Sequence, residues 1–209
     1  DSGVKKVIAL STDKASSPIN LYGATKLTAD KLFVAANNYS MAYGTAFSVV
    51  RYGNVMGSRG SVIPLFRKLA SESKPIPVTD LRMTRFWISI DEAVKFIMDS
   101  FELMEGGELY VPRIPSMKLV DLVSAIAPES KLMEIGLRPG EKLHEEMISA
   151  DDSRRTIILE NRYVVTPVVA EWGYEPPNGP RMSEGQAYRS DTNDLWMSES
   201  DIKNFIKNL

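Results

Sequence analysis

Near its N-terminus the chain reads Val7-Ile8-Ala9-Leu10-Ser11-Thr12-Asp13-Lys14, a short apolar run that ends in four polar residues. An apolar run without alternation is typical of a strand buried on both faces of a parallel sheet. A polar loop continues to Pro18, and apolar residues at steps of three and four then predict a helix over residues 20–40. Residues 45–52 repeat the apolar pattern. Strand, helix and strand in this order predict a βαβ unit and a parallel sheet.

The rest of the chain adds predicted elements of both kinds. The predicted strands are residues 76–78, 85–88 and 108–111, and the predicted helices are residues 61–71, 89–105, 116–126, 140–147 and 198–209. Residues 151–190 are rich in Pro, Gly, Trp and Tyr and only weakly periodic, so we expect a loop-rich lobe or tail there. The order of elements predicts an α/β fold whose parallel sheet is short of strands.

The composition is that of a globular domain and excludes several classes of protein. Of the 209 residues, 44% are hydrophobic and 25% are charged, which is close to average usage. The net charge of −2 argues against binding nucleic acid or a lipid surface through bulk basicity. No apolar run approaches the ~18–20 residues that cross a bilayer. We therefore expect a cytoplasmic protein with neither nucleic acid nor membrane as a partner.

Metal and thiol chemistry are also disfavoured by composition. The chain has no cysteine, which excludes a disulfide framework, a thiol nucleophile and a Cys-type zinc site. Its single histidine, His144, excludes a histidine-cluster metal site and disfavours a Ser-His-Asp hydrolase. We expect no metal, and we expect His144 to be an exposed residue of the helix predicted over residues 140–147.

Two residues of the first predicted helix are candidates for catalysis. Tyr22 and Lys26 are four residues apart, so their side chains share one face of the helix. An ammonium group beside a phenol favours the phenolate, which can accept a proton from a substrate hydroxyl. This spacing is also common on ordinary amphipathic helices. Its position directly after a strand and a polar loop favours an active site at the carboxyl edge of a parallel sheet.

Asp13 and Lys14 lie in that polar loop and offer an acid and a base of opposite charge. In an arbitrary loop such a dipeptide is usually a solvated ion pair. Next to a Tyr/Lys helix the pair suits an elimination, in which one group removes a proton beside a carbonyl and the other protonates the departing hydroxyl.

Several segments together resemble a known enzyme family over essentially the whole chain. They are residues 7–15 and 18–26, then Arg51-Tyr52-Gly53-Asn54-Val55, Gly57-Ser58-Arg59-Gly60-Ser61, Met83-Thr84-Arg85-Phe86-Trp87 and Arg138-Pro139-Gly140-Glu141-Lys142. They resemble the inverting UDP-N-acetylglucosamine 4,6-dehydratases, lyases of polysaccharide and flagellin sugar biosynthesis in the extended short-chain dehydrogenase/reductase superfamily. Retaining, membrane-bound relatives usually carry Met at the position of Tyr22, which favours the inverting branch.

The resemblance implies a role for each catalytic candidate. Tyr22 takes the proton of the sugar C4 hydroxyl while hydride passes from C4 to NADP, and Lys26 holds the nicotinamide ribose. Lys14 removes the C5 proton, and Asp13 protonates the departing C6 hydroxyl. Thr12 forms a hydrogen bond near the C4 oxygen. Hydride then returns to C6 and C5 is inverted, so the net reaction is a dehydration.

The resemblance also implies a site for the nucleotide part of a UDP-sugar substrate. A pyrophosphate requires arginine forks and backbone donors at turns or helix N-termini. The residues implied for the pyrophosphate are Asn54, Arg59, Ser61, Thr84 and Arg85. Arg138 is implied to contact phosphate or uracil, and Glu141 the ribose hydroxyls.

The glycine fingerprint that binds a dinucleotide, G-x-G-x-x-G after a strand, is absent from the sequence. We therefore expect the later part of an incomplete Rossmann-like sheet with a small α+β substrate-binding lobe, inactive alone and binding NADP (or NAD) weakly or not at all. The expected division is residues 1–112 in the nucleotide-binding part, with lobe segments at about 56–85, and residues 113–209 mainly in the lobe and tail. Strands near Val7 and Thr45 would lack neighbours, so we expect a homo-oligomer.

Two other functions fit the same residues. A nucleotide-sugar 4-epimerase needs Tyr22 and Lys26 but has no use for the Asp13–Lys14 pair. A non-catalytic remnant that binds a UDP-sugar would explain the missing fingerprint.

Overall fold

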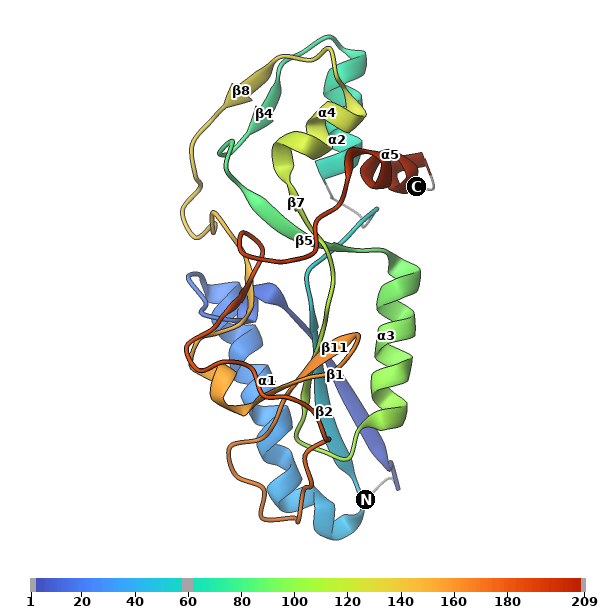
Figure 1. The fold of residues 1–209 in the computed structure, drawn as a ribbon, viewed down its shortest axis with the longest axis vertical. Helices are drawn as coiled ribbons and strands as arrows, with labels where there is room; N and C mark the ends of the chain where they lie inside the picture. Colours follow the sequence, from blue (N-terminus) through green and yellow to red (C-terminus); the bar gives the residue numbers. More distant parts are fainter. Residues whose placement is uncertain (1–2, 58–61, 208–209) are drawn as a thin grey trace. The chain divides into compact units, whose positions relative to one another are not determined.

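The computed structural model describes residues 3–57 and 62–207, which fold into two compact units (Figure 1). The first unit is formed by residues 1–52, 91–113 and 146–188. The second unit is formed by residues 53–90, 114–145 and 189–209. Each unit is thus assembled from segments that are distant in the sequence.

A five-stranded sheet with the order β1-β2-β6-β11-β10 is the centre of the first unit. Its strands are β1 (Lys6–Thr12), β2 (Ala46–Tyr52), β6 (Leu109–Pro112), β11 (Arg162–Val165) and β10 (Thr156–Ile158). The first three strands are parallel, whereas β11 and β10 are added antiparallel. This arrangement confirms the predicted α/β fold with a parallel sheet.

Two helices pack against this sheet, on opposite faces (Figure 1). Phe33 of α1 (Leu21–Ser40) contacts Phe47 of β2, with ring centroids 5.9 Å apart. Phe96 of α3 (Ile90–Leu103) instead joins a hydrophobic cluster with the preceding residue of β2, Ala46. Successive β2 side chains therefore alternate between the two helices, as the period of a strand requires.

Shorter elements complete the first unit. They are the 3-10 helices η1 (Asp13–Ala15), η2 (Met41–Tyr43) and η3 (Asp152–Arg155), and β9 (Glu146–Ile148), which pairs with β12 (Tyr188–Arg189).

The helix α1 is unusual because the residues it buries are Gly23, Asp30 and Asn37. Asn37 donates a 2.8 Å hydrogen bond from Nδ2 to the Phe47 carbonyl and accepts a 2.9 Å bond at Oδ1 from the Phe47 backbone N–H. β2 pairs with β6 at Val49 and Val50. At Phe47, before this pairing begins, the Asn37 side chain bonds to the backbone of β2 instead. A buried backbone group must find such a partner.

We predict that Asn37→Ala lowers the free energy of unfolding by about 1–3 kcal/mol, because the Phe47 N–H loses its side-chain acceptor, whereas the Phe47 carbonyl keeps its 2.7 Å bond from the Gly107 N–H. Denaturant titration measures the change. The matched control is Asn38→Ala, at the exposed neighbour, which should stay within about 0.5 kcal/mol of the parent. Equal losses in both variants would contradict this role of Asn37.

The second unit consists of short strands and three helices around its own core (Figure 1). One sheet has the order β3 (Asn54–Val55), β5 (Thr84–Ile88) and β7 (Ser116–Lys118), and β4 (Ile76–Val78) pairs in parallel with β8 (Leu132–Glu134). Helices α2 (Val62–Ser71), α4 (Leu119–Ile126) and α5 (Glu199–Lys207) contribute to one hydrophobic cluster with these strands.

Some sequence-based expectations are wrong. No helix forms over residues 140–147: the chain turns at Gly140, whose φ is +78°, and continues extended to β9. The segment 151–190 contains β10 and β11, so residues 146–188 extend the sheet of the first unit. The strand predicted from Thr45, β2, has neighbours on both sides, whereas β1 is the edge strand and leaves Leu10 48% exposed.

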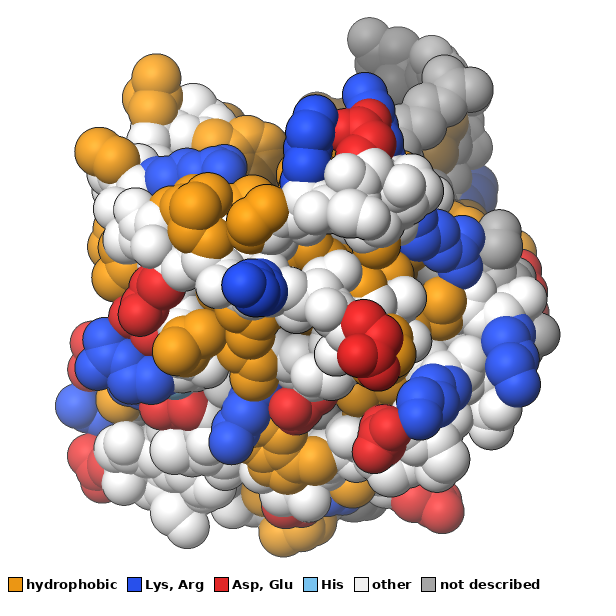
Figure 2. Space-filling view, turned by 90° about the horizontal axis from the view of Figure 1, so that it is seen from above, with side chains coloured by type: hydrophobic (Ala, Val, Ile, Leu, Met, Phe, Trp, Pro, Cys, Tyr) orange, Lys and Arg blue, Asp and Glu red, His pale blue; other side chains and the backbone are white. Residues whose placement is uncertain are grey.

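On the face shown in Figure 2, basic and acidic side chains are interspersed, with hydrophobic side chains between them. The coloured part of this face therefore offers no field of a single sign that would steer a charged partner. Within the described residues, no helix has both the length and the apolar character needed to span a bilayer.

Candidate active site

The predicted catalytic loop follows β1 directly. β1 and β2 are paired in register up to Thr12 and Tyr52, so both strands end at the same edge of the sheet. The side chain of Thr12 caps η1 by accepting a 3.4 Å hydrogen bond from the Lys14 backbone N–H. This local cap fixes the backbone that carries Asp13 and Lys14 immediately beyond the strand.

Asp13 and Lys14 are in direct contact. The Asp13 side chain is fully buried, and its Oδ1 accepts hydrogen bonds from Lys14 Nζ at 3.0 Å and from Thr12 Oγ1 at 2.9 Å. Its second oxygen, Oδ2, is buried and has no hydrogen-bond partner within residues 3–57 and 62–207. A buried acceptor without a partner is uncommon and is found most often where a residue has a role other than stabilising the fold.

The first turn of α1 lies against this loop. Asn20 caps the helix by accepting a 2.8 Å hydrogen bond from the Gly23 backbone N–H. A Cβ atom at Gly23 would lie only 2.3 Å from the carbonyl oxygen of Lys14, so no larger residue fits without a shift. The close approach at Gly23 brings the turn that carries Tyr22 next to the loop that carries Asp13 and Lys14. The Tyr22 side chain itself is 55% exposed.

Lys26 is anchored to the end of β1. Its Nζ donates a 2.7 Å hydrogen bond to the carbonyl of Leu10, one helical turn beyond Tyr22. This bond holds the ammonium group at the carboxyl edge of the sheet.

Tyr52, at the end of β2, is a residue that the sequence analysis did not identify. Burial raises the pKa of Tyr52, and the charge of Tyr22 raises it further, so the two phenols are electrostatic neighbours. Its position as the last residue of the second predicted strand was the available signal.

A buried polar network lies beneath the loop. Asp30 of α1 accepts a 2.8 Å hydrogen bond from Ser11 Oγ of β1 and a 2.9 Å bond from Arg51 Nη2 of β2. Arg51 Nη1 donates to the carbonyl of Met147 at 2.8 Å. The network therefore ties α1, both parallel strands and β9 together. The arginine within the mostly apolar second predicted strand was the sequence signal for this network.

We predict that Gly23→Ala lowers the melting temperature by several degrees, because the added methyl group must push η1 away from α1. Differential scanning fluorimetry of the complete protein measures the shift. Ala24→Ser, at the exposed next position, is the control and should melt like the parent. A Gly23→Ala protein with unchanged stability would show that the close approach carries no constraint.

The second unit contains the residues implied for substrate binding, and Arg85 is buried among them. Its Nη1 donates to the carbonyls of Thr84 at 2.7 Å and Leu143 at 3.1 Å, and its Nη2 donates to that of Lys142 at 2.9 Å. Carboxylates of Glu141 and Glu145 lie 3.7 Å from the guanidinium. Arg85 thus ties residues 141–145 to β5 in a non-helical conformation.

Thr84 is part of a second buried network. Its Oγ1 lies 2.8 Å from His144 Nδ1 and 2.7 Å from Ser190 Oγ, and His144 Nε2 lies 4.0 Å from Asp191 Oδ2. Burial lowers the pKa of His144, with the opposing charge of Asp191 as a weaker influence. The expectation of an exposed helical histidine is therefore wrong, because the extended loop turns His144 toward β5.

The remaining implied substrate residues are placed as follows. Arg138 and Glu141 close one turn, in which the Glu141 backbone N–H donates to the Arg138 carbonyl at 3.0 Å, and Arg138 is exposed. Asn54 has a buried Oδ1 with no partner among the described residues. Arg59 and Ser61 lie outside the described residues. Contact of any of these residues with a nucleotide stays a prediction.

The family model described as "Polysaccharide biosynthesis protein" matches residues 1–167. The chain belongs to this family. Within the family, the chain is 53% identical over 215 aligned residues to an inverting UDP-N-acetylglucosamine 4,6-dehydratase of Campylobacter jejuni, covering 99% of this chain and 64% of that protein. It is 38% identical to a UDP-glucose 4-epimerase of Rickettsia bellii, covering 77% of this chain and 48% of the epimerase. The chain thus spans less than two thirds of these relatives.

Solved structures agree with this assignment. Pen from Bacillus thuringiensis is 37% identical, with a TM-score of 0.85, and the match covers 99% of this chain and 63% of Pen. DesIV from Streptomyces venezuelae, a dTDP-glucose 4,6-dehydratase crystallised with NAD, has a TM-score of 0.60 at 23% identity over 68% of this chain and 51% of DesIV. The likeness to DesIV concerns the fold alone. The predicted Rossmann-like fold and the predicted family resemblance are both confirmed.

Proposed function

We propose that a protein containing these residues is a UDP-N-acetylglucosamine 4,6-dehydratase, a lyase that inverts C5 of the sugar. The contact between Asp13 and Lys14 beside the first turn of α1 is the observation that carries this proposal. The 53% identity to the Campylobacter jejuni enzyme supports it. We further propose that the protein is cytoplasmic and forms a homo-oligomer.

In the proposed reaction, Tyr22 accepts the proton of the C4 hydroxyl. Its partial exposure leaves the phenol accessible to substrate, and Lys26 lies one helical turn away. Thr12, whose hydroxyl donates a hydrogen bond to Asp13 Oδ1, is proposed to form a hydrogen bond near the C4 oxygen of the sugar.

Asp13 and Lys14 are proposed to carry out the elimination. The resulting C4 ketone acidifies the C5 proton, which Lys14 removes as a neutral amine. The proton required by the acid can pass from Lys14 Nζ to Asp13 along the 3.0 Å hydrogen bond between them. The carboxylic acid then donates to the departing C6 hydroxyl, and water leaves.

A nicotinamide dinucleotide, when bound, supplies the chemistry of transient C4 oxidation and of reduction at C6. The residues present fit its nicotinamide end, because Lys26 is anchored at the carboxyl edge of the parallel strands one turn from Tyr22. We propose NADP, with NAD as the alternative. The sequence holds no glycine fingerprint, so its pyrophosphate would require residues outside these 209.

The second unit is proposed to bind the UDP part of the substrate. Asn54 offers a buried oxygen without a partner, and Arg138 offers an exposed guanidinium. Arg85 is proposed to contribute mainly by fixing the loop that carries Arg138 and Glu141.

A 4-epimerase is the second candidate, favoured by the 38% identity to the Rickettsia bellii enzyme. An epimerase would return a sugar epimer without loss of water and would not require Asp13 or Lys14. The products distinguish the two activities.

We predict that Tyr22→Phe lowers kcat for loss of water by about 10²- to 10⁴-fold, because the acceptor of the C4 proton is removed. Tyr39→Phe, on the same helix and 79% exposed, is the matched control and should retain parental kcat. The assay measures 4-keto product from UDP-N-acetylglucosamine with the complete protein. A fully active Tyr22→Phe variant would contradict the proposed role.

We predict that Lys14→Gln abolishes exchange of the C5 proton with deuterium when the reaction is run in D₂O, because the proposed base is lost. Mass spectrometry of recovered sugar nucleotide measures the exchange. Lys5→Gln, at an exposed lysine before β1, should exchange like the parent. Persistent exchange in Lys14→Gln would rule out Lys14 as the base, whereas an epimer as the only product of the parent would establish the second candidate.

A further inference from the structure

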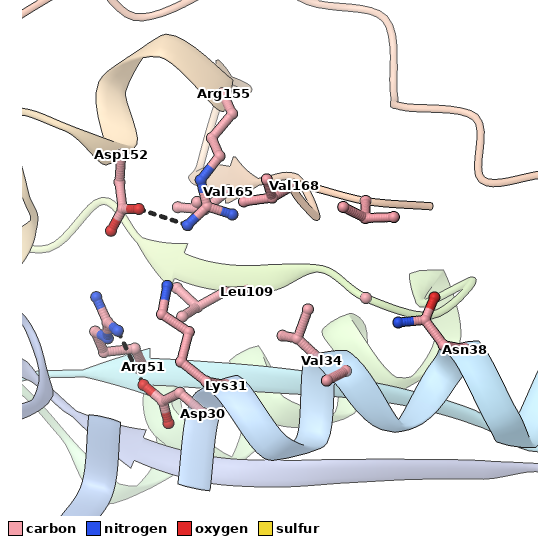
Figure 3. A pocket seen from close by; sticks show the side chains of 13 residues that line it. Asp30, Lys31, Val34, Asn38, Arg51, Leu109, Asp152, Arg155, Val165 and Val168 are labelled. Atoms are coloured by element: carbon pink, nitrogen blue, oxygen red, sulfur yellow. Dashed lines mark hydrogen bonds and ion pairs between the residues drawn. The ribbon is translucent and has the colours of Figure 1, made fainter. Parts of the chain in front are cut away.

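A cavity of about 310 Å³ lies within the first unit, between α1 and the far strands of the sheet (Figure 3). It is lined by residues of α1, β2, β6, η3 and β11, and by Val168 and Val169. It does not contain the catalytic candidates Asp13, Lys14 or Tyr22. Its volume is at the lower end of the range of about 300–1,000 Å³ for small-molecule sites.

Charged side chains gather at one end of this cavity (Figure 3). Most of their hydrogen-bonding groups are already engaged. Arg51 pairs with Asp30 at 2.9 Å, and Arg155 pairs with Asp152 and donates to the Thr166 carbonyl at 2.6 Å. Burial acts to raise the pKa of Asp152, but the charge and hydrogen bond of Arg155 outweigh it, so the pKa is lowered and this carboxylate is ionised at neutral pH.

One donor at the charged end is available to a ligand. Lys31 is exposed and lines the cavity, and its side chain extends from α1 toward Asp152 (Figure 3). The charge of Lys31 helps to lower the pKa of Asp152, but within the described residues its ammonium group forms no hydrogen bond. An acceptor group of a ligand can therefore bond to it directly.

The remainder of the cavity is aliphatic. Val34, Leu109, Val165 and Val168 line it beyond the charged end, and Asn38 lies at the opposite end (Figure 3). Val168 is 77% exposed, so the aliphatic part opens to solvent. A ligand that fits must therefore join an acceptor group to a short apolar body.

The charge of the lining indicates which kind of acceptor group fits. The three cations Lys31, Arg51 and Arg155 outnumber the two carboxylates Asp30 and Asp152 by one, so the lining carries a net charge of +1. A monoanion matches this sum, whereas a phosphate dianion would be repelled by the two carboxylates.

We propose that this cavity is a binding site for an aliphatic monocarboxylate, whose carboxylate is bound by Lys31. The site is independent of the proposed activity. It nevertheless adjoins the network beneath the catalytic loop, because Arg51 also holds Asp30, which accepts from Ser11.

The test is calorimetric titration of the complete protein with octanoate, with octanol and inorganic phosphate as the comparison ligands. Octanoate should bind, octanol should bind at least about fivefold more weakly because it lacks the charge, and phosphate should not bind. Lys31→Gln should weaken octanoate binding about fivefold or more and leave octanol unchanged. Ala35→Phe, which places a ring in the cavity from an exposed position of α1, should abolish binding of both.

Lys95→Gln is the matched control, since Lys95 is an exposed lysine of α3 on the other face of the sheet. It should bind octanoate like the parent. Absence of octanoate binding by the parent, or octanoate binding that is unchanged in both Lys31→Gln and Ala35→Phe, would overturn the proposal. Phosphate binding that is lost in Lys31→Gln would also overturn it, in favour of a simple anion site.

Discussion

The buried ion pair between Asp30 and Arg51 sets the position of α1, and the arrangement of the candidate catalytic residues in the first unit depends on that position. Both side chains are less than 5% exposed, so breaking the pair would leave an uncompensated charge in the interior. Asp30 also accepts from Ser11, the residue that precedes the Thr12–Asp13–Lys14 loop. A helix that presents Tyr22 and Lys26 is thereby fixed to the two strands that end at the loop.

Close contacts at the first two turns of α1 fix the helix further against the loop. At Gly23 the helix approaches the Lys14 carbonyl so closely that a side chain would collide with it. Lys26 bonds back to Leu10, and Lys14 contacts Asp13. The same device appears in the second unit, where Arg85 binds backbone carbonyls and holds a loop extended. In each unit a buried arginine thus fixes backbone next to the candidate site residues.

The proposed monocarboxylate site lies next to the same arginine. Arg51 donates its two terminal nitrogens to the Met147 carbonyl and to Asp30, and it also lines the cavity. The cavity therefore adjoins the network beneath the loop. A ligand at that site would lie beside a group that helps to place α1.

The sequence by itself determined only the local part of the first unit. The apolar runs and the Tyr22–Lys26 spacing depend on neighbours within a few residues, and they predicted β1, α1, β2 and the loop after β1. Only the tertiary structure decided the conformation of residues 140–147, the pairing of β10 and β11 with β6, the partnership of Tyr52 with Tyr22, and the Asp30–Arg51 network. The physical reason is that these features depend on contacts between residues tens of positions apart, such as Arg85 with Lys142. Such contacts outweigh local helix propensity, and they produce no periodic pattern of apolar residues in the sequence.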